Sequence, residues 1–207
     1  MLPHKIEKEL LALPDVSRET LERWSNYVDE LLKWNKSINL VGPLTVQDVW
    51  QRHILDSAQL LRHIPSDAKI ICDFGAGAGL PGLILALTER FDTHLVESNQ
   101  KKASFLRAIA HKTKRKTTVH DARIEKLTAW ESDILTARAL APMPKLLDLL
   151  SDFIDKTKLC LFLKGQNVVE EIEEATRYWD FEYELHPSMT HPDSVIVAMK
   201  HISRRPS

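Results

Sequence analysis

The sequence predicts an α/β protein: a seven-stranded, doubly wound (Rossmann-like) sheet that ends in an antiparallel hairpin and is preceded by a helical extension. From residue 69 onward, segments typical of strands alternate with segments typical of helices, which indicates parallel βαβ units. The first strand segment runs into a turn with four glycines in eight residues. The last two strand segments have no helix between them, only a loop with two prolines.

The chain before this alternation is expected to be helical. We divide it into an N-terminal helical extension, residues 1–65, and an α/β domain, residues 66–207. A helix is predicted over 17–34 with Ser17 as its N-cap, and a second helix over about 45–63. The inward positions of the first helix are Leu21, Trp24, Val28, Leu31 and Leu32.

The α/β domain is expected to contain seven strands and four helices. The predicted strands are 69–74, 93–98, 116–121, 133–138, 159–164, 181–185 and 194–202. The predicted helices are 80–90, 101–114, 144–155 and 168–179. Seven strands with a terminal hairpin favour the class I methyltransferase variant of the doubly wound sheet over a standard dinucleotide-binding fold.

Composition places the protein among ordinary globular domains. The chain has 207 residues, a net charge of -1 and 43% hydrophobic residues, so no global charge points to nucleic acid. Cys72 and Cys160 stand alone in hydrophobic segments, which suits buried thiols in the cytoplasm and predicts neither a disulfide framework nor a metal site. No segment has the length or character of a signal peptide or membrane span.

The glycine turn predicts a cofactor site but does not by itself choose the cofactor. Gly77, Gly79 and Gly82 fit the dinucleotide fingerprint, whereas Gly75, Gly77 and Gly79 after Asp73 fit the D-x-G-x-G-x-G pattern that suits S-adenosylmethionine. Either ligand would lie beyond the carboxyl ends of the strands. The Asp73 carboxylate is expected either to reach the cofactor or to brace the loop.

The ends of the second and third predicted strands are also expected to contact the cofactor. Glu97 ends the second strand, where an acid can accept hydrogen bonds from ribose hydroxyls, although it could also be a solvated acid. In methyltransferases the loop after the third strand covers the adenine, so a similar loop here would let Ile124 pack on the ring and let Ile124 and Glu125 offer backbone groups to its edge. Alternatively, Arg123 and Glu125 could form a simple surface ion pair.

Several motifs together resemble the family of ribosomal RNA small subunit methyltransferase G, also called glucose-inhibited division protein B. They are LLKWNKSINL at 31–40, RHILDS at 52–57, DFGAGAGLPG at 73–82, ARAL at 137–140 and LKGQ at 163–166. The resemblance implies transfer of a methyl group from S-adenosylmethionine to N7 of a guanine of bacterial 16S rRNA, guanine 527 in the rRNA numbering. It places cofactor contacts at Gly75, Leu80, Ile124, Glu125 and Arg138. One departure is HPDSVIV before the last strand, where such proteins often carry a basic residue.

The residues fit a reaction that needs no general base. Guanine N7 carries a lone pair and no proton, and the Asn/Asp-Pro-Pro-aromatic motif of amino-group methyltransferases is absent from the sequence. The route that remains for methyl transfer is in-line displacement, which depends on holding the two reactants close together and correctly oriented. Side chains at strand ends and in RHILDS are the candidates for the active site, namely Arg138, Lys164, Arg52 and His53. The polar residues of RHILDS could instead form a helix ion-pair network that only docks the N-terminal helices on the sheet.

Two further patches are candidates for RNA binding. Asn35, Lys36 and Asn39 follow the first long helix, where they could equally serve turn chemistry. Lys112, Lys114 and Arg115 could contact phosphate or could simply complement a helix dipole. We expect a monomer whose partner is 16S rRNA, free or within the 30S subunit. An NAD-dependent oxidoreductase and a non-catalytic RNA-binding module remain the alternatives.

Overall fold

A computed structural model describes residues 2–206. Its α-helices are α1 (His4–Leu11), α2 (Arg18–Asn35), α3 (Asp56–Ala58), α4 (Gly82–Ala86), α5 (Gln100–Ala110), α6 (Met143–Ile154) and α7 (Val168–Ala175). Its strands are β1 (Ile70–Phe74), β2 (Asp92–Val96), β3 (Thr117–His120), β4 (Ser132–Arg138), β5 (Thr157–Lys164), β6 (Trp179–Pro187) and β7 (Val195–Arg204). Short 3₁₀ or π-helical segments are η1 (Pro43–Thr45), η2 (Trp50–Leu55), η3 (Gln59–Arg62) and η4 (Ile124–Lys126).

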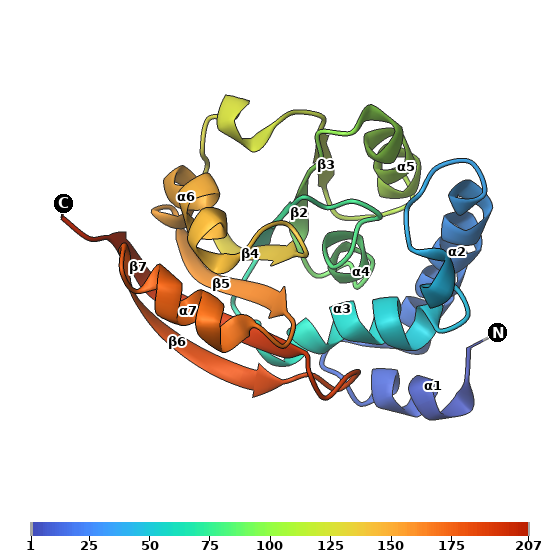
Figure 1. Cartoon of the computed structure of the whole chain (residues 1–207). Helices are drawn as coiled ribbons and strands as arrows, with labels where there is room; N and C mark the ends of the chain where they lie inside the picture. Colours follow the sequence, from blue (N-terminus) through green and yellow to red (C-terminus); the bar gives the residue numbers. More distant parts are fainter. Residues whose placement is uncertain (1, 207) are drawn as a thin grey trace.

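The strands form one sheet in the order β3-β2-β1-β4-β5-β7-β6 (Figure 1). The first five strands in chain order are parallel, and β7 pairs antiparallel with both β5 and β6. This confirms the predicted doubly wound sheet and its terminal hairpin. The strand order reverses between β1 and β4, and ligands of such sheets bind beyond the carboxyl ends of the strands at this point.

Alternate residues of the central strands feed two separate cores. Ile71, Leu95 and Ile134 belong to one cluster, together with the N-terminal helices, α4 and α5. Cys72 and Leu135 face the opposite side and pack with α6 and α7. Figure 1 shows these two groups of helices on either side of the sheet. Successive residues of a strand face opposite sides of the sheet, and both sides are buried here. The sequences of these strands are therefore continuously hydrophobic.

The N-terminal helices pack directly on the α/β domain. Ser17 caps α2 as predicted, because its hydroxyl accepts a hydrogen bond from the Thr20 amide at 3.3 Å. Trp24 donates from its indole to the Ile84 carbonyl at 2.9 Å, and the Tyr27 hydroxyl donates to the Ala78 carbonyl at 2.7 Å. The extension therefore packs against the glycine turn and α4 and helps to hold them in place.

Three helix predictions need correction. The helix expected over 45–63 is broken into η1, the π-helical segment η2, one turn of α3 and η3. A π-helical turn adds a residue per hydrogen-bonded ring and is frequent at functional sites. The helix expected over 80–90 is only α4, and α7 stops at Ala175 because Trp179 already pairs with β7.

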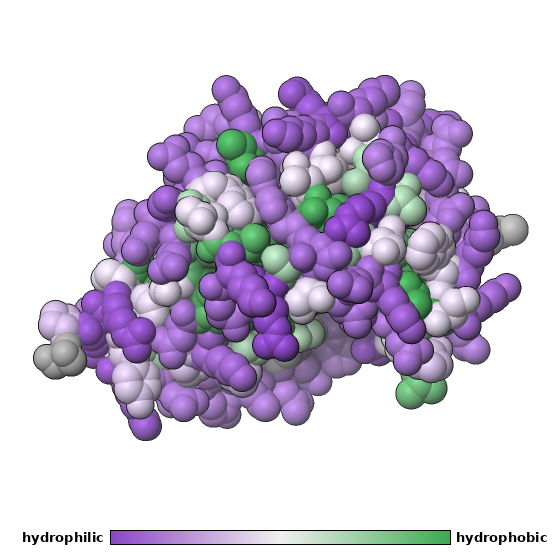
Figure 2. Space-filling model, turned by 90° about the horizontal axis from the view of Figure 1, so that it is seen from above, coloured by the Kyte–Doolittle hydropathy of each residue, from purple (hydrophilic) through white to green (hydrophobic). Residues whose placement is uncertain are grey.

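The surface is mostly polar in the view from above. Figure 2 shows hydrophobic residues there only as small areas between hydrophilic ones. Among residues 2–206, no helix is both long enough and apolar enough to span a bilayer. Both cysteines are free and buried, and burial raises the thiol pKa of Cys72 to about 11 and of Cys160 to about 12.

Candidate active site

The glycine turn joins β1 to α4, and its glycines have different roles. Gly77 adopts φ +58°, and its amide donates to the Glu97 carboxylate at 2.9 Å. A Cβ at Gly77 would meet only the Gly75 carbonyl oxygen, at 3.7 Å. At Gly82, by contrast, a Cβ would lie 2.4 Å from the Leu95 side chain. Gly77 therefore keeps a surface open, whereas Gly82 lets α4 pack closely on the sheet.

Asp73 braces this turn from inside the protein. Its side chain is fully buried, and its two carboxylate oxygens accept hydrogen bonds from the Gly82 amide at 2.9 Å and the Thr136 hydroxyl at 2.8 Å. Burial raises the pKa of Asp73 to about 7, against the opposing effect of these bonds. Of the two roles expected from the sequence, bracing is the one that the geometry supports. A direct contact between Asp73 and a cofactor stays a prediction.

A cavity of about 350 Å³, the turn cavity, opens where β1, β2, β3 and β4 end. It brings together five of the predicted cofactor residues, namely Gly75, Gly77, Glu97, Ile124 and Glu125. The other predicted cofactor residues, Asp73, Gly79, Leu80 and Arg138, do not line it. A volume of this size suits a cofactor of nucleoside dimensions.

Sequence reasoning missed several walls of the turn cavity. These are Val96, Ser98, Lys102, Ala122, Arg123, Ala139, Leu140 and Leu149. Ser98 and Lys102 could have been found, because Ser98 directly follows Glu97 and Lys102 lies in the first turn of the next helix, α5. Leu149 lies in the middle of α6, where nothing in the local sequence distinguishes it from any other helix position.

Glu97 is held rigidly at the mouth of the turn cavity. Its side chain is buried, and its carboxylate accepts from the Gly77 amide at 2.9 Å and the Asn99 amide at 2.7 Å. Asn99 in turn caps α5. Each carboxylate oxygen has two lone pairs, so both can still accept a hydroxyl. The geometry is therefore compatible with the expected ribose contact.

A second, larger cavity of about 1020 Å³, the large cavity, lies beside the first. All four side chains predicted for the active site line it, namely Arg52, His53, Arg138 and Lys164. Its walls come from η2, the ends of β4 and β5, and the loop between β6 and β7. Ala139 and Leu140 line both cavities, and Ala139 adopts the left-handed φ of +52°. The loop after β4 is therefore a shared wall with backbone strain.

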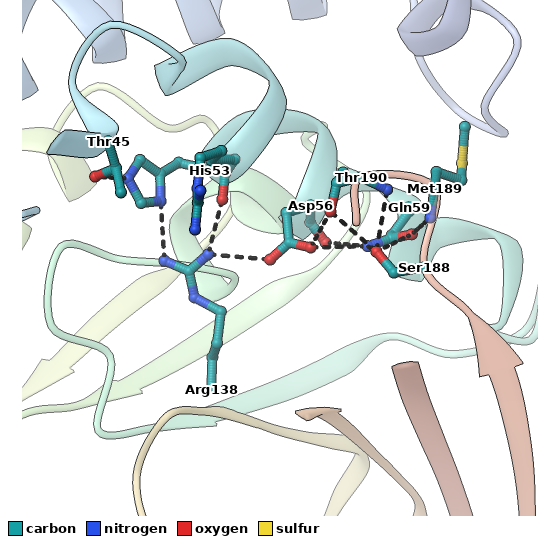
Figure 3. A network of polar contacts seen from close by, with 9 residues as sticks. Thr45, His53, Asp56, Gln59, Arg138, Ser188, Met189 and Thr190 are labelled. Atoms are coloured by element: carbon teal, nitrogen blue, oxygen red, sulfur yellow. Dashed lines mark hydrogen bonds and ion pairs between the residues drawn. The ribbon is translucent and has the colours of Figure 1, made fainter. Parts of the chain in front are cut away.

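Arg138 is oriented by a polar network at one side of the large cavity (Figure 3). Its guanidinium donates from Nη1 to the Asp56 carboxylate at 3.1 Å and from Nη2 to His53 Nδ1 at 3.4 Å. Because an arginine only donates, His53 must carry its proton on Nε2, which donates to the Thr45 hydroxyl at 2.8 Å. Burial first, and then Arg138, lower the pKa of His53 to about 4. The imidazole is neutral at physiological pH.

Lys164 and Arg52 differ in burial and in whether they form an ion pair with another side chain. The Lys164 ammonium is nearly buried and donates to Glu171 and to the Ala141 carbonyl, both at 2.7 Å, so it fastens the shared wall. The Arg52 side chain is exposed and forms no ion pair within the described residues. Arg52 is thus the cation in this cavity best able to meet a phosphate.

The two predicted RNA-binding patches lie at different edges of the sheet. Asn35 accepts from the Leu40 and Val41 amides at 2.8 and 3.0 Å, so its side chain shapes the turn that leaves Lys36 and Asn39 exposed. α2 runs toward the glycine turn, which places these residues at the carboxyl edge of the strands.

The basic loop before β3 lies at the opposite edge, where strands begin. Lys112 pairs with Glu30 at 3.8 Å and Lys114 pairs with Glu89 at 3.3 Å. Arg115 donates to the Glu89 carbonyl at 3.3 Å. This placement does not support the predicted phosphate contact, and topology alone could have revealed it, since a loop entering a parallel strand lies away from the ligand edge.

Comparisons with known proteins agree with this geometry. The model of the family described as rRNA small subunit methyltransferase G matches residues 20–197. Ribosomal RNA small subunit methyltransferase G of Paramagnetospirillum magneticum is 44% identical over 197 residues, covering 95% of this chain and 96% of that protein. The protein of the same name from Cereibacter sphaeroides is 42% identical over 200 residues, covering 94% and 97%.

Solved structures resemble the fold at low sequence identity. Magnesium protoporphyrin IX methyltransferase from Synechocystis with bound S-adenosylmethionine superposes with a TM-score of 0.59 at 13% identity, covering 89% of this chain and 97% of that one. The 16S rRNA methylase ArmA gives 0.56 at 14% identity, covering 84% and 97%. The chain therefore belongs to the rRNA small subunit methyltransferase G family and is an rRNA methyltransferase that uses S-adenosylmethionine.

Proposed function

We propose that this protein, acting as a cytoplasmic monomer, transfers the methyl group of S-adenosylmethionine to N7 of guanine 527 of 16S rRNA. The observation that carries the proposal is the pair of cavities with one shared wall. The turn cavity suits the cofactor, and the large cavity has room for a guanine nucleotide and carries cations. Ala139 and Leu140 stand between the two.

The cofactor supplies an electrophilic methyl group on a sulfonium. The protein contributes position. Glu97 would hold the ribose of the cofactor beside the backbone of Gly77, and Ile124 would offer an apolar side chain to its adenine. A proximity effect of this kind can lower a barrier by roughly 7–11 kcal/mol.

In the large cavity, the side chains orient the base without exchanging protons. Arg138 is always positively charged, and its guanidinium N–H groups can donate to guanine O6, which lies beside the reacting N7. His53 is neutral and already uses both ring nitrogens, so it holds Arg138 in place. Arg52, which is exposed and has no ion pair among residues 2–206, is assigned to a phosphate of the RNA backbone.

The test is a methylation assay on 16S rRNA, free and within 30S subunits, from cells that lack this modification. Labelled S-adenosylmethionine should yield one 7-methylguanosine, located by nuclease mapping and mass spectrometry. Arg138→Ala should slow the reaction more than it weakens RNA binding. A methyl group on an exocyclic amine, or on no nucleoside, would refute the proposal.

The RNA-facing edge can be tested separately by salt dependence. Each phosphate contact contributes a slope of about 0.7–0.9 in log affinity against log salt. Arg52→Ala should therefore lower the slope by about one unit, and Lys114→Ala, a matched loss of charge at the other edge, should leave it unchanged. The reverse result would return the RNA interface to the loop of Lys112, Lys114 and Arg115.

A further inference from the structure

Asp56 connects two walls of the large cavity through its two carboxylate oxygens. Oδ2 accepts from the Arg138 guanidinium at 3.1 Å, at the end of β4. Oδ1 accepts from the Thr190 hydroxyl at 2.8 Å, in the loop between β6 and β7. Figure 3 shows the carboxylate between these two partners. The residues 56, 138 and 190 come from three distant parts of the chain, and only the fold brings them together.

A buried amide reinforces the connection to the loop. Gln59 is 1% exposed, one helical turn after Asp56. Its Nε2 donates to the Asp56 carboxylate at 3.1 Å and to the Ser188 hydroxyl at 3.0 Å, and its Oε1 accepts from the Met189 amide at 2.8 Å. A buried amide with this many partners is costly to disturb, because each lost partner strands a polar group.

The loop that these bonds hold forms part of the wall of the large cavity. Thr190, His191, Asp193 and Ser194 line the cavity from this loop. Gln51 also donates to the Thr190 carbonyl, at 3.2 Å. The loop has no helix or strand of its own between β6 and β7, although the Ser188 amide donates to the Ser194 carbonyl at 2.9 Å. The bonds from Gln51, Asp56 and Gln59 attach it to the segment that carries Arg52 and His53.

We propose that Asp56 is a positioning residue that sets Arg138 and the Ser188–Thr190 loop relative to each other, so that the cavity is shaped for the guanine before RNA binds. The inference rests on the proposed function of the large cavity. Asp56 itself needs no contact with the base. One carboxylate oxygen orients the Arg138 guanidinium, and the other holds Thr190 in the loop between β6 and β7.

Thr190 offers a matched pair of variants. Thr190→Val keeps the shape of the side chain but removes the hydroxyl, and Thr190→Ser keeps the hydroxyl. We expect single-turnover methylation at saturating RNA to fall about tenfold in Thr190→Val and to stay within twofold of wild type in Thr190→Ser. Affinity for S-adenosylmethionine should be unchanged in both, because Thr190 lies outside the turn cavity. Equal rates for the two variants would overturn the inference.

A double-mutant cycle tests the coupling itself. Arg138→Lys and Thr190→Val act through the same carboxylate, so their combined rate loss should be smaller than the product of the single losses. In the Asp56→Asn background, Thr190→Val should cost less than in wild type. Losses that simply multiply would overturn the inference. Wild-type protein that makes no 7-methylguanosine would instead refute the proposed function, so the two failures are distinguishable.

Discussion

Replacing Gly77 by alanine should separate cofactor binding from folding. Gly77 has φ +58°, and a left-handed conformation costs a non-glycine residue about 1–2 kcal/mol. The new Cβ meets nothing closer than the Gly75 carbonyl oxygen at 3.7 Å, so packing adds no further penalty. For a domain of this size, such a loss lowers the melting temperature by roughly 2–8 °C.

Cofactor affinity should fall as well, for a reason that is independent of the loss in stability. The added methyl group stands on the wall of the turn cavity, in space that the cofactor needs. Overpacking of this kind costs about 1–3 kcal/mol, so titration calorimetry with S-adenosylmethionine should show affinity reduced roughly 5- to 150-fold.

Gly82→Ala is the matched control for this experiment. Its Cβ would lie 2.4 Å from Leu95 and 2.6 Å from Asp73, inside the packed core. This variant should therefore lose much more stability than Gly77→Ala. Unchanged cofactor affinity in a folded Gly77→Ala protein would refute the placement of the cofactor in the turn cavity.

Three further predictions concern Glu97, His53 and Lys164. Glu97→Ala strands the Gly77 and Asn99 amides, so calorimetry should show S-adenosylmethionine binding weakened by about 1–3 kcal/mol, and Glu97→Gln should lie between it and wild type. The pKa of His53 falls from 6.5 when unfolded to about 4 when folded, so its contribution to stability, present above pH 6.5, should be lost as pH falls toward 4. Melting curves at different pH should show this loss of stability, and the loss should be smaller in His53→Gln. The single-turnover methylation rate should stay flat from about pH 6 to 9. A rate that rises through neutral pH in wild type and is flat in His53→Gln would show that the histidine acts as a base. If Lys164 only fastens the shared wall through Glu171, then Lys164→Met and Glu171→Gln should lower the methylation rate alike; a loss confined to Lys164→Met would place the ammonium on the substrate.

Much of the fold could be predicted because its signals are local. The period-two burial of the strands, the glycine turn after β1 and the acid after β2 each lie within a few residues of sequence. The prediction of Gly75, Gly77 and Glu97 at one site required only that parallel strands end at the same edge of a sheet. Their common placement around the turn cavity follows from that topology. The prediction for Ile124 and Glu125 rests also on the resemblance to methyltransferases.

The sequence by itself determined where the strands lie along the chain, the kind of turn after the first of them and the edge at which ligands bind, because these depend on neighbouring residues and on chain direction. Only the tertiary structure decided that Asp73 braces the turn, that Lys164 is paired with Glu171, and that Asp56 meets Thr190. Such roles depend on burial and on partners up to 134 residues away, since a carboxylate or ammonium has the same local signature whether it faces a ligand or another side chain.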